Sequence, residues 1–200
     1  MRDLRSYQVA FESKTVARIS TLIDDLEELG KSRFGYRVYT SEIQGCLMGG
    51  LLLAAASVSY ALLELFVRDL DVMYIIALRY GGDVKLTSRV ERELETDRKA
   101  GFSEMLKDLQ QTVVEVADAD KLRDFYNDTR IPLAHGLVRR LTKELPEEFD
   151  DMFARIARRG KLEQRFEGEA IGDVEFVLMM MKKYLPWLLR RYSASDEVQI

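Results

Sequence analysis

Long helical periodicity with few interruptions is the feature that most constrains the fold of this chain. Only three prolines and twelve glycines punctuate 200 residues, which is few for a protein built from many short strands. The periodic stretches are rich in Ala, Leu, Glu, Lys, Arg and Met, all strong helix formers. In the first stretch, apolar residues recur at intervals of three or four: Val16, Ile19, Leu22 and Leu26. The sequence therefore predicts an all-α fold.

The breaks between periodic stretches delimit the expected helices. The first spans residues 4–29 and is closed by Gly30, and a polar connection over 31–40 follows. Ser41 then caps a largely apolar helix that runs to Arg79. The remaining helices are expected at 89–99, 102–117, 118–128, 128–145 and 147–159 and, after a polar link containing Gly160, Gly168 and Gly172, at 173–192, where Pro186 should introduce a kink.

Length and charge bound the organisation of the chain and its partners. Two hundred residues is the size of one domain, and no composition shift forces a boundary, so residues 1–200 are expected to form a single domain. The formal net charge of -4 argues against a protein that coats nucleic acid without specificity. Adjacent basic pairs form either a local positive patch or ordinary solvated helix surface: Arg139–Arg140, Arg158–Arg159, Lys182–Lys183 and Arg190–Arg191.

Residues 47–63 carry no charge and approach the length of a membrane span. Gly49, Gly50, Ser57 and Ser59 dilute the hydrophobicity of this run, and Glu64 follows it directly. We therefore expect a central helix, enclosed by other helices or by a dimer partner, and no membrane association.

The redox and targeting features agree with a cytoplasmic location. Cys46 is the one cysteine, so it cannot form an intramolecular disulfide, and its apolar surroundings predict a small buried residue. The first seven residues are polar and lack the apolar core of a signal peptide.

Arg130 and His135 are the residues with the clearest potential for chemistry. A guanidinium can hold a phosphate through two parallel hydrogen bonds, and an imidazole can move a proton near neutral pH. Pro132 favours the first turn of a helix, so this helix should begin near Asp128 or Thr129. The two residues are five positions apart, which places their side chains about 140° apart on an ideal helix, so that they diverge within one chain. One phosphate approached by groups from two copies of the motif is the arrangement that this geometry favours.

In this region the sequence resembles the HEPN domains (higher eukaryotes and prokaryotes nucleotide-binding). Their signature is an arginine, four to six residues and a histidine, near the start of a late helix of an all-α bundle. Arg130 and His135 have four residues between them, and Gly136 follows. The apolar run 54–64, which ends in an acidic residue, is similar to another helix of the family. The resemblance covers about residues 41–145, with a closing helix at about 173–192, and implies an up-and-down helical bundle with additional terminal helices.

What the resemblance implies about function is a homodimer in which two motifs face each other across one cleft. The implied activity is metal-independent cleavage of RNA to a 2′,3′-cyclic phosphate, of a toxin or antiviral-defence kind. His135 would be the general acid or base and Arg130 would hold the phosphate. No cofactor is expected, and one histidine without paired cysteines offers no metal-ligand set. An antitoxin protein is a possible partner.

Several neighbouring residues are secondary candidates for binding or orienting the substrate. Family members that cut RNA usually carry a polar residue after the arginine, whereas this chain has Ile131, and Asn127 or Asp128 is the candidate substitute. Glu64 either orients the motif or is a solvated residue paired with Arg68. Arg139 and Arg140 either extend a positive surface beside the cleft or balance a helix C-terminus. Ile131 also favours the alternative function, a HEPN-like dimer that binds RNA, a nucleotide or a protein without cutting.

Overall fold

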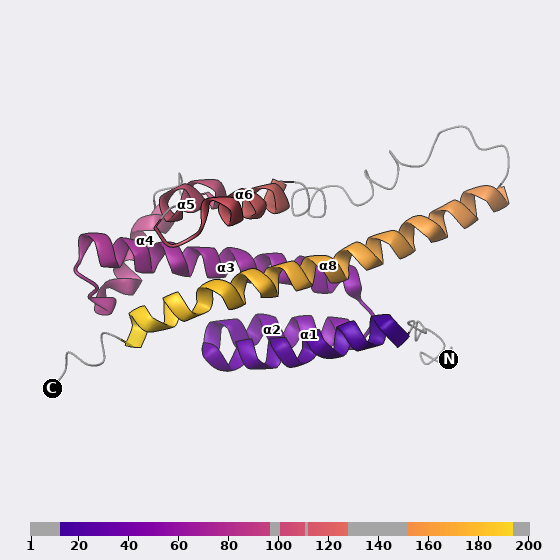
Figure 1. Cartoon of the computed structure of the whole chain (residues 1–200), viewed down its shortest axis with the longest axis horizontal. Coiled ribbons are helices and arrows are strands. Elements are labelled where there is room, and N and C mark those ends of the chain that lie inside the picture. The colour runs from indigo at the N-terminus through magenta and orange to yellow at the C-terminus, as the bar shows by residue number, and fades with distance from the viewer. Residues whose placement is uncertain (1–12, 97–100, 111, 128–151, 194–200) are drawn as a thin grey trace. The chain divides into compact units, whose positions relative to one another are not determined.

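The computed structural model describes residues 13–96, 101–110, 112–127 and 152–193 (Figure 1). Over these residues it consists of α-helices, one short 3-10 helix and connecting turns, with no β-strand. The predicted all-α class is therefore confirmed. In chain order the elements are α1 (Ser13–Ser32), α2 (Phe34–Met48), α3 (Leu52–Arg79), η2 (Val84–Leu86), α4 (Thr87–Thr96), α5 (Phe102–Leu109), α6 (Val116–Phe125) and α8 (Met152–Ser193).

The chain divides into two compact units, described here one at a time. Of the described residues, the first unit contains α1, α2, the start of α3 up to Leu62 and α8 up to Leu178. The second unit contains α3 from Leu63, then η2, α4, α5 and α6, and α8 from Met179.

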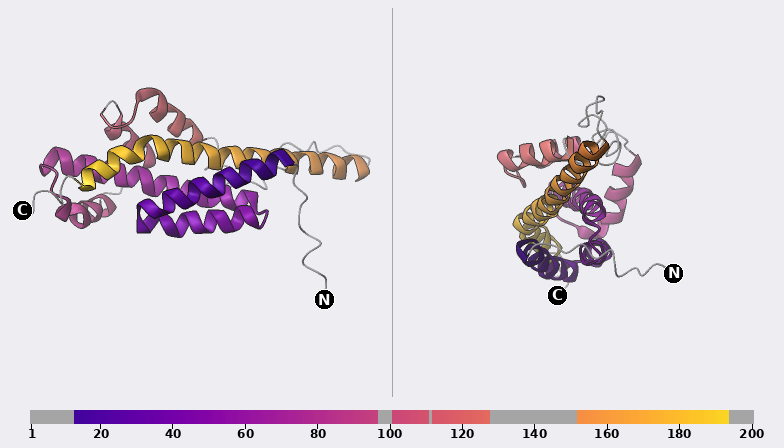
Figure 2. Two further views of the ribbon diagram at one scale, coloured as in Figure 1. Left: turned by 60° about the horizontal axis from the view of Figure 1, so that its bottom comes forward. Right: turned by 90° about the vertical axis from the view of Figure 1, so that its right-hand side faces the viewer.

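Helices α1 and α2 form a helical hairpin in the first unit, and they lie side by side in every view (Figures 1 and 2). Arg33, with extended φ and ψ of -155° and 137°, is the whole connection between them. The predicted end of the first helix at Gly30 and the polar connection over 31–40 are therefore wrong. The reason is that Tyr36 and Thr40 are buried and extend a stripe, through Ile43 and Leu47, that holds this segment in a helix.

Gly30 has a packing role inside α1 rather than a role in ending the helix. A Cβ atom at this position would lie 2.5 Å from the Thr40 hydroxyl oxygen on α2. The absence of a side chain therefore allows the two helices to approach closely. Nearby, the Gln44 side-chain amide donates a hydrogen bond to the Ile23 carbonyl at 2.9 Å.

The uncharged run over residues 47–63 is broken by a turn. Gly50 adopts a φ of 72°, its amide donates to the Leu47 carbonyl, and the Leu51 amide donates to the Cys46 carbonyl at 2.8 Å. This pattern is a Schellman motif, which ends a helix. The single helix expected from Ser41 to Arg79 is consequently two helices, α2 and α3. Among the described helices, none combines the length and hydrophobicity that a membrane span requires.

Two polar contacts accompany the apolar packing of α8 in the first unit. The Arg18 guanidinium of α1 makes a bidentate pair with the Glu175 carboxylate, at 2.8 and 2.7 Å. The Tyr60 hydroxyl of α3 donates to the Asp173 carboxylate at 2.6 Å. Between and beside these contacts, α8 contributes a buried stripe made of Ala170, Ile171, Val174, Val177 and Leu178.

Helix α8 is continuous where the sequence predicts a polar link and a joint. Gly160, Gly168 and Gly172 lie within its helical span, and so does Pro186. Each of these residues lowers the stability of a helix, an interior glycine by about 1 kcal/mol relative to alanine. From Ala170 onwards one face of α8 is buried, and this apolar packing offsets the cost of Gly172 and Pro186.

In the second unit, α5 and α6 correspond to the two helices expected at 102–117 and 118–128, but α5 ends eight residues earlier than predicted and α6 begins two residues earlier. Helix α5 buries an apolar stripe made of Phe102, Met105, Leu106 and Leu109. At Gln110 the backbone becomes extended, and the amides of Val113 and Val114 both turn back to the Leu109 carbonyl. The stripe of α5 therefore ends at Leu109, and Val116 is exposed at the start of α6.

Candidate functional site

Most of the predicted site falls on residues that the structure does not describe. Arg130 and His135 belong to this group, as do Asp128, Arg139 and Arg140. The helix expected over 128–145 lies there as well. The pairing of Arg130 with His135 and the site shared between two copies therefore stay predictions.

Two of the predicted site residues are described, and both belong to the second unit. Asn127 is exposed directly after α6 and its cap residue, Tyr126. Glu64 is half-buried on α3. Its two interpretations, as a partner that orients the motif or as a surface residue, both stay open.

The segment that leads into the motif is anchored by aromatic stacking. The ring of Tyr126 stacks on that of Phe102, the first residue of α5, with centroids 4.4 Å apart and planes 7° apart. Stacked aromatic pairs contribute about 0.5–1.5 kcal/mol beyond their buried area. The stack holds the end of α6 at a point only four residues before Arg130 in the sequence.

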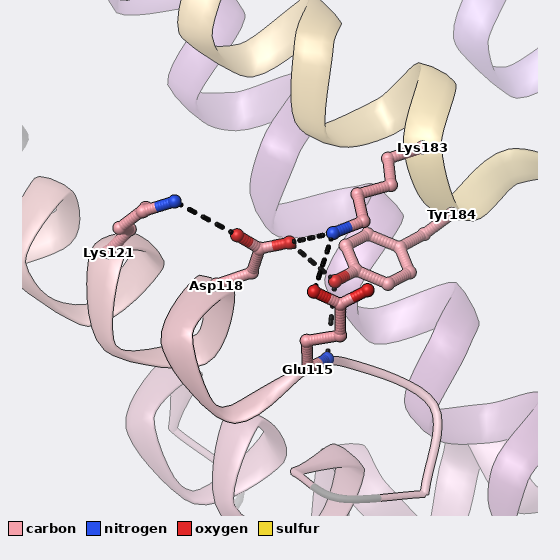
Figure 3. Close-up of polar contacts among 5 residues, drawn as sticks. All are labelled: Glu115, Asp118, Lys121, Lys183 and Tyr184. Atoms are coloured by element: carbon pink, nitrogen blue, oxygen red, sulfur yellow. Dashed lines mark hydrogen bonds and ion pairs between the residues drawn. The ribbon is translucent and has the colours of Figure 1, made fainter.

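A polar cluster that the sequence did not reveal lies between the start of α6 and α8 (Figure 3). It is centred on the buried carboxylate of Asp118 and consists of Glu115, Asp118, Lys121, Lys183 and Tyr184; we call it the Asp118 cluster. Asp118 Oδ2 accepts hydrogen bonds from Lys183 Nζ and from the Tyr184 hydroxyl, both at 2.7 Å. Asp118 Oδ1 accepts a third from Lys121 Nζ at 3.3 Å.

Two further contacts close the Asp118 cluster. Lys183 Nζ also lies 2.8 Å from Glu115 Oε2, and it therefore bridges two carboxylates. The Tyr184 hydroxyl accepts a hydrogen bond from the Glu115 backbone amide at 3.2 Å. Because that amide belongs to the N-cap residue of α6, the cluster satisfies an otherwise unpaired helix-end donor.

The charges of the Asp118 cluster stabilise one another. Hydrogen bonds from Lys183 and Tyr184 lower the pKa of Asp118 to about 2. The bonds to Asp118 and Glu115 raise the pKa of Lys183. Burial, followed by the bond to Asp118, raises the pKa of Tyr184. Near neutral pH the carboxylate and the ammonium are both charged and the phenol is neutral, so the arrangement is suited to bracing α6 against α8 and not to proton transfer.

Two of the basic pairs on α8, Lys182–Lys183 and Arg190–Arg191, include side chains with described partners within the chain. Lys183, predicted as one half of a basic pair, belongs to the Asp118 cluster. Arg190 Nε donates to the Pro186 carbonyl at 3.1 Å, and the Arg191 guanidinium lies 5.3 Å from the centre of the Trp187 ring. The charge of Lys183 is therefore balanced within the chain, whereas the contacts of Arg190 and Arg191 leave both interpretations of that pair open. The other two pairs lie outside the side chains that the structure describes.

A second buried carboxyl group in the same unit has a different environment. Asp71 of α3 is 1% exposed, and no described group forms a hydrogen bond with its Oδ1 atom. Burial, together with the negative charge of Asp108, raises the pKa of Asp71 to about 7, although Arg79 acts in the opposite direction. No sequence pattern marks Asp71, because an acidic residue inside an apolar helix is ordinarily read as a solvated position.

Among the described side chains, no group of three or more His, Cys, Asp and Glu residues gathers in a way that could hold a metal ion. Cys46, expected to be buried, is half-buried, and its partial burial, followed by the negative charge of Glu42, raises the pKa of its thiol. Comparison of the chain with known protein families, with curated proteins and with solved structures found no match.

Proposed function

We propose that this protein is a metal-independent endoribonuclease of the HEPN toxin or defence type, with a site shared across a homodimer. The observation that carries the proposal is the motif itself: Arg130, four residues and His135, followed by Gly136, at a helix start marked by Pro132. The all-α architecture of the described residues supports it, because the motif belongs to an all-α family. A cytoplasmic location would supply the RNA substrate.

The proposed reaction needs only the two motif residues and the RNA. One of the two His135 imidazoles removes the proton of a ribose 2′-hydroxyl, and the oxygen attacks the adjacent phosphorus. The bond from phosphorus to the 5′-oxygen breaks, a His135 imidazole donates a proton to that oxygen, and a 2′,3′-cyclic phosphate is left. Arg130 holds the non-bridging phosphate oxygens through two hydrogen bonds and stabilises their growing charge.

The test is incubation of the purified protein with RNA in the presence of EDTA. Wild type should cut, and His135→Ala should cut about 10² to 10⁴-fold more slowly, the usual contribution of one acid or base. Arg130→Ala should show a comparable loss. Arg89→Ala is the matched control, since it removes an arginine whose described partner, Glu93, lies on the same helix α4. Intact RNA with wild type, or equal cutting by His135→Ala, would refute the nuclease proposal.

The shared site can be tested separately by mixing variants. A dimer of one Arg130→Ala subunit and one His135→Ala subunit still holds an arginine and a histidine from different copies. Such a mixed dimer should regain roughly half of the wild-type rate if the site pairs the two copies, whereas either variant alone should stay inactive. A strict monomer in solution would remove the composite site.

The second candidate function is a HEPN-like dimer that binds RNA, a nucleotide or a protein without cutting. Ile131 is the observation that favours it, since it places an apolar residue where cutting members carry a polar one. Ile131→Asn separates the two functions. If wild type binds RNA without cutting it and Ile131→Asn cuts, the binding function is the correct one. Growth arrest on expression, relieved by His135→Ala, would instead support a toxin and justify a search for an antitoxin protein.

A further inference from the structure

Asp71 is a buried carboxyl group without the partners that such a group ordinarily has. It lies in the middle of α3, where Leu70, Val72 and Met73 are also almost fully buried. Its Oδ1 atom has no hydrogen-bond partner among the described groups. Buried charges in proteins are paired with an opposite charge or hydrogen-bonded, because desolvation of an unpaired carboxylate is very costly. A group in this position avoids that cost by keeping its proton.

The described charges around Asp71 also favour its neutral form. Asp108 on α5 acts on Asp71 with a negative charge of its own. Arg79 opposes this effect, but it is exposed and lies eight residues further along α3, about 12 Å along the helix axis. Asp69, also buried, is two residues away on the same helix and about 200° around it, so its side chain projects from another side of α3.

We propose that Asp71 makes the second unit a proton-sensitive element: the closed unit holds this side chain as a neutral acid, and loss of the proton favours opening around α3 and α5. Opening brings the carboxylate into water and separates it from Asp108. The closed form of the unit therefore becomes less favoured as the pH rises from acidic to neutral values. This inference does not depend on the nuclease activity, because it concerns a different part of the chain.

Hydrogen exchange of the full-length protein tests the proposal. The protection factors of the α5 amides at Met105, Leu106 and Leu109, corrected for the intrinsic pH dependence of exchange, should fall by roughly one to two orders of magnitude between pH 5 and pH 7 and level off above pH 8. In Asp71→Asn the fall should disappear. In Asp108→Asn it should persist with a smaller amplitude, because the repulsion from Asp108 is removed.

Two controls make the result specific. Asp124→Asn neutralises an exposed carboxylate on α6 and should leave the wild-type profile unchanged. If Asp71→Asn does not fold, the carboxyl carbon of Asp71 in the wild-type protein can be titrated by nuclear magnetic resonance. A midpoint near neutral pH supports the proposal, whereas a midpoint near pH 4 overturns it. Equal profiles for wild type and Asp71→Asn would overturn it as well.

Discussion

Asp118 and Asp71 are both buried aspartates of the second unit, and their environments are opposite. Asp118 accepts three hydrogen bonds, two of them from lysine ammonium groups. Asp71 has an unpartnered oxygen and feels the negative charge of Asp108. The pKa of Asp118 is lowered to about 2, whereas that of Asp71 is raised to about 7.

The comparison teaches that burial alone does not decide whether a carboxyl group is charged. Both side chains have lost most of their contact with water, which by itself raises the pKa of an acid. At Asp118 the donors of α6 and α8 outweigh that effect, and at Asp71 nothing described does. One carboxylate therefore stabilises the folded unit near neutral pH, and the other destabilises it.

Of the substitutions that test this difference, Asp118→Ala should change the free energy of unfolding most. It leaves the Tyr184 hydroxyl and Lys183 without their shared acceptor, and the free energy of unfolding at pH 7 should fall by about 2–3 kcal/mol. Urea denaturation measures this change. Asp120→Ala, on the same helix, breaks only the exposed pair with Arg123 and should change stability by less than about 0.5 kcal/mol. Equal effects of the two substitutions would show that the Asp118 cluster does not stabilise the packing of α6 on α8.

Asp71→Asn should change stability in the opposite direction. The amide has nearly the same shape but no charge, so at pH 7.5 the free energy of unfolding should rise by about 1–2 kcal/mol, with little change at pH 4. The folded-state pKa lies above the unfolded value of 3.8, so the wild type loses stability as the pH rises towards 7. Thermal unfolding at both pH values measures the difference. A loss of stability at pH 7.5 would contradict this assignment.

The loss of stability between pH 4 and pH 2 should come in large part from protonation of Asp118. Its folded-state pKa, about 2, lies below the unfolded value of 3.8, so its contribution is present above pH 4 and is lost as the pH falls towards 2. After allowance for solvent screening, the loss is about 1 kcal/mol. In Asp118→Asn the free energy of unfolding should fall less between pH 4 and pH 2, and its pH dependence above pH 4 should be unchanged. Denaturation curves at pH 2, 3 and 4 show whether it does.

Tyr184→Phe should have the smallest effect. It removes one hydrogen bond to Asp118 and one from the Glu115 amide while keeping the ring, and should cost about 0.5–1 kcal/mol. The double-mutant cycle with Asp118→Ala isolates the contact between them. A coupling free energy of zero would mean that the hydroxyl does not contribute to the cluster.

Local patterns were sufficient for the helical class and for much of the core. The apolar stripe through Leu22 and Leu26, and that of α5 from Phe102 to Leu109, are buried as their spacing predicts. The boundaries were predicted less well. Gly30 ends a helix in the sequence interpretation but is a packing position, whereas Gly50 forms the turn that divides α2 from α3. A glycine can serve either purpose, and the neighbouring helix decides which.

The functional candidates also include one that the sequence could reveal and one that it could not. Arg130 and His135 could be recognised because their chemistry and spacing are local properties of the chain. The Asp118 cluster could not, since 65 residues separate Asp118 from Lys183 and no periodicity links them. For this reason Lys183 stood out in the sequence only as one half of a basic pair.

The amino-acid sequence alone determined the all-α class, the apolar faces of the helices and the motif on which the proposed function rests, because each depends on residues within a few positions of one another. Only the tertiary structure decided which buried carboxyl group is paired and which is not. Asp118 meets donors from α8, whereas Asp71 lies near Asp108 of α5. The charge of a buried group depends on neighbours that folding brings from distant positions, so the same residue type acts as a brace in one place and as a proton-sensitive group in the other.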